Sequence, residues 1–205
     1  VITVTDLTVA AGGANGLNAV NALAKSVTST ATTITGAYAD VYTALLANNS
    51  QKIANNNVVA TGAGENLVGL DAVNVQLTES TSAQVNTIEA LTTGTLSAAI
   101  STDDIADLLH GSTGINQLTR THNLTLHVDD TTLFASDLAI LNAKTTGKIT
   151  VNATTLVGTA ADVKAAYADL NSGLLNLNNE AVTITGGISV ADFNTIAAAT
   201  SGLVT

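Results

Sequence analysis

The side chains of this chain that could do chemistry are few and cluster in the stretch from residue 103 to residue 130. Histidine occurs three times, at His110, His122 and His127. His122 and His127 are close in sequence and are followed by Asp129 and Asp130. A structural or catalytic metal site would need further ligands at matched spacing. We therefore interpret the histidines as polar residues of turns and of an outward strand face.

The acidic side chains are a better candidate for a metal site, and the metal that suits them is calcium. Extracellular acidic proteins often bind Ca²⁺ through carboxylate and carbonyl oxygens. The candidate ligands are Asp103, Asp104, Asp107, Asp129 and Asp130. The glycine-rich nonapeptide loops of calcium-binding β-rolls are absent. The alternative interpretation is that these acids cap helices and keep the surface soluble.

The sequence carries no recognisable catalytic motif. Serine, histidine and aspartate are present, but the Gly-x-Ser-x-Gly turn that exposes a nucleophilic serine is absent. Cysteine is also absent, which excludes a thiolate nucleophile and a disulfide framework. Gly62-Ala-Gly64 is too short to form a phosphate loop. We predict that the chain is not an enzyme and that it uses no cofactor, unless it binds calcium.

Composition and charge narrow the class of protein further. The 205 residues include 6 Lys and Arg against 16 Asp and Glu, which gives a net charge of −10. Because nucleic acids and anionic membranes are bound through basic side chains, we expect no nucleic-acid partner, and binding to anionic membrane surfaces is disfavoured. No apolar run reaches the ~18 residues of a membrane span. A mean hydropathy of +0.36 argues against disorder.

The amino-acid composition of the chain is unusually restricted. It lacks Pro, Met and Trp and is only 2% aromatic, whereas about ten prolines would be expected at ordinary usage. Such bias is typical of a sequence derived from repeats. With Val1 in place of an initiating Met, we expect a processed product or an internal fragment.

Internal repeats are the most informative feature. Three segments show an alternating strand pattern, a polar turn, an Ala/Leu/Ile helix pattern and then Thr-Thr-Gly or Thr-Ser-Gly; they end at Gly94, Gly147 and Gly202. A looser copy occupies residues 2–28. A second motif alternates with the first, because residues 36–41 match 158–163 and residues 101–105 form a degraded copy. The spacing predicts one continuous array with units 1–66, 67–123, 124–180 and a partial unit 181–205.

The local patterns predict strands and helices within each unit. Alternation places Leu124, Leu126 and Val128 on one strand face, and Ile149–Val151 forms the next strand. Helical spacing predicts apolar stripes in residues 135–143 and 160–170; their members are Leu138, Ile140, Leu141, Val163, Ala166, Tyr167 and Leu170. Candidate N-caps are Ser136, Thr159 and Ser189. We expect the five rings, Tyr38, Tyr42, Phe134, Tyr167 and Phe193, to lie mostly in the core.

Strands that alternate with helices of this length normally run in parallel. The sequence therefore predicts an α/β fold, namely a repetitive parallel-strand solenoid of strand–helix coils of about 26–32 residues. The alternative is a compact two-layer α/β domain. An all-β-helix is a weaker third possibility.

Three phrases resemble a known group of proteins: Leu141–Ile149, Gly158–Tyr167 and Leu177–Ile184. They are similar to the tandem repeats of very large surface and secreted proteins of cyanobacteria, which are adhesin-like or hemolysin-like. The resemblance covers roughly residues 124–205 well and residues 1–123 loosely. It implies export, a cell-surface or extracellular location and a structural or adhesive role, and it implies no catalytic residue.

Together these observations predict a structural module of extracellular assembly, such as a filament, a surface layer or an adhesin stalk. The partner would be another copy of the chain, joined through end strands at Ile2, Val4, Leu203 and Val204. Surface glycans or other matrix proteins are further candidate partners. A calcium-dependent adhesion module is the alternative function.

Overall fold

The computed structural model describes residues 2–13, 16–23, 27–54, 67–101, 104–109, 113–168 and 174–205. These residues form a mixed α/β protein with parallel sheets. The chain divides into two compact units, residues 1–99 and residues 100–205. Whether the four repeat units act as one continuous array stays a prediction.

The first unit contains two parallel sheets, which pack with helices α1, α2 and α3. One sheet has the order β1-β3-β5 and the other has the order β2-β4-β6-β7. The strands are β1 (Ile2–Val4), β2 (Thr8–Ala10), β3 (Val27–Ser29), β4 (Thr33–Gly36), β5 (Leu67–Val68), β6 (Asn74–Leu77) and β7 (Leu96–Ala99). The helices are α1 (Leu17–Leu23), α2 (Tyr38–Ala54) and α3 (Ser82–Glu89).

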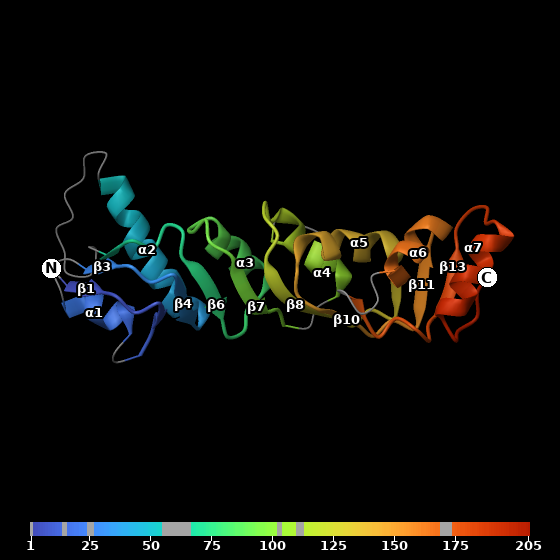
Figure 1. Ribbon diagram of the computed structural model, residues 1–205, viewed down its shortest axis with the longest axis horizontal. Coiled ribbons are helices and arrows are strands. Elements are labelled where there is room, and N and C mark those ends of the chain that lie inside the picture. Colours follow the sequence, from blue (N-terminus) through green and yellow to red (C-terminus); the bar gives the residue numbers. More distant parts are fainter. Residues whose placement is uncertain are drawn as a thin grey trace. The chain divides into compact units, whose positions relative to one another are not determined.

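The second unit has the same construction. Its sheets have the orders β8-β10-β12 and β9-β11-β13, and helices α5, α6 and α7 pack in succession beside the second sheet (Figure 1). The strands are β8 (Asn123–Val128), β9 (Thr132–Phe134), β10 (Ile149–Val151), β11 (Thr155–Gly158), β12 (Leu174–Leu175) and β13 (Ala181–Ile184). The helices are α4 (Ile105–Leu109), the 3₁₀ turn η1 (Ile115–Gln117), α5 (Ala135–Lys144), α6 (Ala160–Ala168) and α7 (Val190–Ala199).

The path of the chain differs from the predicted strand–helix coil. Two short strands, not one, precede most helices; β8 and β9, for example, are separated only by residues 129–131. Leu126 of β8 pairs with Ile149 of β10, so this turn of the chain contains fewer residues than the predicted coil. Thr33 of β4 pairs with Asn74 of β6, so the turn that contains α2 is longer than the predicted coil. The sequence analysis missed the second strand of each pair, because β9, for example, lies in the segment that it predicts as a polar turn.

The predicted apolar faces form the core of each unit. Leu124, Leu126 and Val128 are at most 1% exposed, and Leu138 and Leu141 are fully buried. The prediction for Ile140 was wrong, because this side chain is 45% exposed on the outer face of α5. Leu170 lies outside the described residues. A layer of helices against a parallel sheet fits the compact two-layer alternative, whereas a solenoid is not shown.

Two of the three predicted helix caps are confirmed. The hydroxyl of Thr159 accepts a hydrogen bond from the Asp162 N–H at 3.3 Å, and that of Ser189 accepts from the Asp192 N–H at 3.0 Å. Ser136 is not a cap, because α5 begins one residue earlier and Phe134 occupies the cap position without a side-chain bond.

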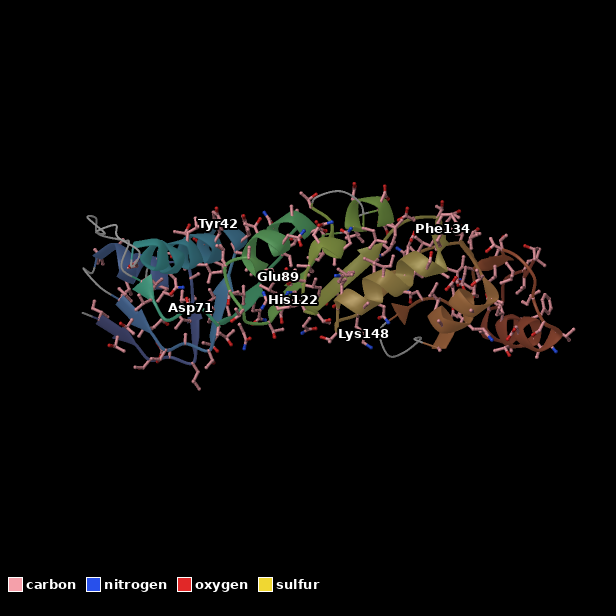
Figure 2. The ribbon with its side chains drawn as sticks, turned by 90° about the horizontal axis from the view of Figure 1, so that it is seen from above. Tyr42, Asp71, Glu89, His122, Phe134 and Lys148 are labelled. Atoms are coloured by element: carbon pink, nitrogen blue, oxygen red, sulfur yellow. The ribbon has the colours of Figure 1, made fainter. Side chains whose placement is uncertain are left out.

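The aromatic side chains are less buried than expected. Tyr167 is buried, but Phe134 and Phe193 are 53% and 40% exposed. Tyr38 and Tyr42 are half-buried and stack on each other, with ring centroids 5.5 Å apart; Figure 2 shows Tyr42 on α2. Small aliphatic residues therefore supply most of the core.

The Thr-Thr-Gly repeat joins neighbouring turns of the chain. The buried hydroxyl of Thr145 donates to the Leu124 carbonyl at 2.6 Å and accepts from the N–H of Leu124 and of Gly147, each at 2.8 Å. Gly147 leaves no space for a side chain, since an added Cβ would lie 2.1 Å from the Leu124 oxygen. The motif is therefore a structural clasp between the end of a helix and the strand one turn earlier.

The clasp recurs at the other two copies of the motif. Thr92 donates to the Val73 carbonyl at 2.8 Å, and Thr200 donates to the Glu180 carbonyl at 2.7 Å. At Gly94 and Gly202, an added Cβ would lie 2.0 Å from a backbone oxygen of the preceding turn. The repeat that the sequence shows is thus explained by backbone pairing, without any ligand.

Candidate functional site

The predicted calcium ligands lie at different positions and have different structural roles. Asp130 accepts a hydrogen bond from the Ile105 N–H at 2.6 Å, so its carboxylate caps the start of α4. Asp104 and Asp107 are exposed at the start of the same helix, and Asp103 lies outside the described residues. Among the residues that the structure describes, no three His, Cys, Asp or Glu side chains come together as a metal site. Calcium binding stays a prediction.

A second polar group forms around Asn152, at the end of β10. Its side-chain amide donates to Asp129 Oδ1 at 2.9 Å and lies 2.9 Å from His127 Nε2. His127 Nε2 and Asp129 Oδ1 are 3.5 Å apart, and both side chains are about half exposed. The structure therefore brings together an acid and a histidine that are close in sequence, and adds an asparagine from the next turn.

The other histidines do not join this group. His122 is 1% exposed at the start of β8, and its backbone bonds to Lys144 and Thr146 as part of the clasp (Figure 2). His110 lies outside the described residues. The described His122 and His127 thus lie in different surroundings, and whether the histidines bind a metal stays a prediction.

A buried polar pair that the sequence analysis missed lies between α6 and the start of β13. The Tyr167 hydroxyl donates a hydrogen bond to the carboxylate of Glu180, which is 1% exposed. Burial, and secondarily the Glu180 carboxylate, raises the pKa of Tyr167 above its usual range, so the phenol stays protonated. The carboxylate also accepts the Asn179 N–H at 3.1 Å. The pair is satisfied internally and positions the bend before β13.

Helices α6 and α7 are joined by an ion pair. Lys164 of α6 bonds to the carboxylate of Asp192 in the first turn of α7. The Lys164 ammonium, together with the Ser189 hydroxyl, lowers the pKa of Asp192 below its usual value of 3.8. The same carboxylate thus accepts a hydrogen bond from Ser189, the cap of its own helix, and binds a lysine of the neighbouring helix.

The predicted assembly residues lie on strands at the margins of the sheets. Ile2 is 45% exposed on β1, which pairs with β3 among the described strands of the first unit. At the other end of the chain, Val204 forms a bridge to Val182 of β13, and Leu203 is 71% exposed. Strands of this kind retain one edge at which a further strand could pair.

Helix α7 exposes a position that the other helices bury. The residue after the first-turn Asp or Gln is fully buried in four helices, at Val41, Val85, Leu138 and Val163. The corresponding residue of α7 is Phe193, which is 40% exposed, and Val190 on the same helix is 79% exposed. Of the residues of α7, only Ile196 is buried. We call Val190, Phe193 and Leu203 the terminal apolar face.

Comparison with known proteins gives no relative: no family model, no curated protein and no solved structure matches this chain. No helix in the described ranges is long and apolar enough to cross a membrane. The proposed function therefore depends on the geometry of the chain and on the resemblance of its repeats.

Proposed function

We propose that this chain is a structural repeat module of an exported cell-surface protein, and that it acts in extracellular assembly by stacking one copy on another. In this proposal the turns of the chain continue as a parallel α/β solenoid, and the module performs no catalytic step. The resemblance to repeats of large surface proteins supports the extracellular location, and the clasp supports the stacking of successive turns.

The observation that carries the proposal is the exposure of Phe193. This position is 0% exposed in α2, α3, α5 and α6, whereas Phe193 keeps 40% of its surface. A phenyl ring exposed at a position that is otherwise in the core marks a face that a further layer could cover. Burying the 40% of Phe193 that is exposed would stabilise an interface by roughly 1 kcal/mol, because full burial of a Phe side chain contributes roughly 1.5–3 kcal/mol. The matching strand segment, Leu203–Thr205, pairs with β13 on one side through Val182.

The proposed occupant is the N-terminal face of a second copy. That face carries the margin strand β1 and exposed apolar side chains, since Ile2, Leu7 and Leu23 are 45%, 71% and 89% exposed. The two faces belong to different surfaces of the chain, so the contact is head-to-tail and repeats in every added copy. Backbone pairing would continue the sheet, and the apolar residues would close the layer.

The test is the mass of the purified chain in solution, measured by light scattering over a range of concentrations, with negative-stain microscopy of the particles. We expect discrete oligomers or filaments for the wild type and monomers for Phe193→Asp. The control is Phe134→Asp, which alters an exposed ring at the start of α5 (Figure 2) and should leave assembly intact. A strictly monomeric wild type, or equal loss in both variants, would overturn the proposal.

A calcium-dependent adhesion module remains the second candidate. One observation favours it: the Asp130 carboxylate accepts the N–H of Ile105, the residue that follows Asp104 in the chain. Repeating the mass measurement with millimolar calcium separates the two candidates. Assembly that requires calcium would favour the adhesion module, and assembly that is indifferent to calcium would favour stacking alone.

A further inference from the structure

A polar hollow opens in the second unit where two neighbouring turns of the chain change direction. Its volume is about 380 Å³, which lies in the usual range for small-molecule sites. The lining residues are Val151, Asn152, Ala153, Thr154, Asn176, Asn178 and Asn179. Four of the seven are asparagines.

The hollow results from a difference in length between two bends. The bend between β10 and β11 consists of residues 152–154, whereas the longer bend between β12 and β13 consists of residues 176–180. Asn176, at the start of the longer bend, has a φ of 70°. This value lies in the left-handed region, which asparagine tolerates better than most residues. Because Thr155 still pairs directly with Ala181, the longer bend must bulge away from the shorter one.

The bulged bend is held in place from within. Leu177 is fully buried, the Asn178 carbonyl accepts the Ser201 N–H at 2.9 Å, and the Asn179 N–H donates to Glu180 at 3.1 Å. On the opposite wall, the Asn152 amide is fixed by Asp129 and His127. The backbone of the longer bend and the Asn152 side chain are therefore held in place before any ligand arrives, which lowers the entropy cost of binding.

The lining chemistry points to a neutral ligand rich in hydroxyl groups. Asn178 and Asn179 each carry a side-chain carbonyl acceptor and two N–H donors, and Thr154 carries a hydroxyl. Asn152 offers its side-chain carbonyl, because its amide nitrogen faces Asp129 and His127. A sugar hydroxyl likewise both donates and accepts. None of the seven lining residues is charged, and the whole chain carries −10, so an anionic ligand finds no counter-charge. A divalent cation would find carbonyl oxygens but no carboxylate in the lining, whereas Ca²⁺ sites normally use several carboxylates.

We propose that this hollow binds a neutral saccharide unit through the amides of Asn152, Asn178 and Asn179. The site lies wholly within the second unit, so binding does not depend on head-to-tail assembly. It would give the structural module an adhesive activity toward uncharged surface glycans.

The experiment uses the full chain labelled with ¹⁵N and follows backbone and asparagine side-chain amide signals during titration. The probes are methyl α-glucoside, methyl α-mannoside, methyl β-galactoside and N-acetylglucosamine, each raised to about 100 mM, well above the dissociation constant on the order of 1 mM that we expect for a single sugar unit. We expect at least one probe to give saturable shifts centred on residues 151–154 and 176–179.

The matched variants are Asn178→Ala with Asn179→Ala, and Asn123→Ala as the control. The double change removes two amides but keeps the backbone bonds that hold the bend, whereas Asn123 is an exposed asparagine of β8 outside the lining. We expect at least tenfold weaker binding in the double variant and no change in the control. Absence of saturable shifts with all four probes, equal binding by the double variant, or shifts of these amides with calcium chloride alone would overturn the proposal. The Phe193→Asp variant should still bind the sugar. A failure of the assembly proposal can therefore be distinguished from a failure of the saccharide proposal.

Discussion

At the scale of single residues, the first threonine of the Thr-Thr-Gly motif has a structural role that neither its polarity nor its frequency indicates. Thr145 is 5% exposed, although threonine is usually a surface residue. Its hydroxyl is used both as a donor and as an acceptor, which a buried hydroxyl requires if it is not to destabilise the fold.

We predict that Thr145→Val destabilises the protein by about 1–3 kcal/mol, because the shape is kept while the Leu124 N–H loses its partner. Urea unfolding followed by circular dichroism measures the change. Thr146→Val is the matched control, since that hydroxyl makes only a 3.4 Å contact with the His122 carbonyl in a half-buried setting. Equal destabilisation by the two changes would contradict the assigned role.

The glycine of the same motif provides a second residue-scale prediction. Gly147→Ala should be strongly destabilising, because the new Cβ would meet the Leu124 oxygen at 2.1 Å and the backbone cannot move away without breaking the pairing. Gly187→Ala should be tolerated, since nothing lies within 4 Å of its added Cβ. Thermal unfolding of both variants compares the two sites, and a tolerant Gly147 would show that the clasp is not tight.

At the scale of elements, the pairing of α6 with α7 depends partly on pH. The pKa of Asp192 is lowered in the folded chain, so its contribution to stability is present above the unfolded value near 3.8 and is lost as the pH falls through the lower folded value. The groups responsible are Lys164 and Ser189, in that order.

We expect Lys164→Met to lower the melting temperature slightly at neutral pH, and the difference from the wild type to shrink as the pH falls through the lowered pKa of Asp192. Asp192→Asn should remove the same pH-dependent component. The double variant should lose no more of it than either single change, because both act on one ion pair. A difference that stays constant with pH would show that Lys164 stabilises through packing alone.

At the scale of the whole molecule, each of the two compact units holds its own core. In the second unit, the core residues of β8, β10 and β11 meet those of α5 and α6; they include Leu126, Ile149, Leu156, Leu141 and Val163, all at most 1% exposed. A unit with its own core can fold by itself.

We therefore predict that residues 100–205, expressed alone, give a folded protein with one cooperative unfolding transition. Far-ultraviolet circular dichroism and urea titration provide the measurement. A fragment without a cooperative transition would show that the second unit depends on the first. Such a result would not contradict the stacking proposal, but it would show that the full chain is the smallest unit that folds.

Sequence patterning names part of the candidate surface and misses the rest, and the assembly role of that surface stays a prediction. Leu203 and Ile2 are predicted at exposed margins, and both are exposed. Phe193 is expected in the core because a helix pattern reports which side of the helix is apolar, and not whether a neighbour covers that side. The asparagine hollow is missed because it depends on the relative lengths of two bends in successive turns of the chain, at Asn152 and Asn176.

The sequence by itself determined the alternating strands, the helix stripes, two of the helix caps and the repeat, because these depend on residues that are close along the chain. It also determined the acidic charge and the absence of cysteine. Only the tertiary structure decided that most turns have two strands, that Thr145 and Gly147 clasp the preceding turn, and that Asp129 meets Asn152. These features depend on the register between successive turns of the chain, and local periodicity carries no information on that register.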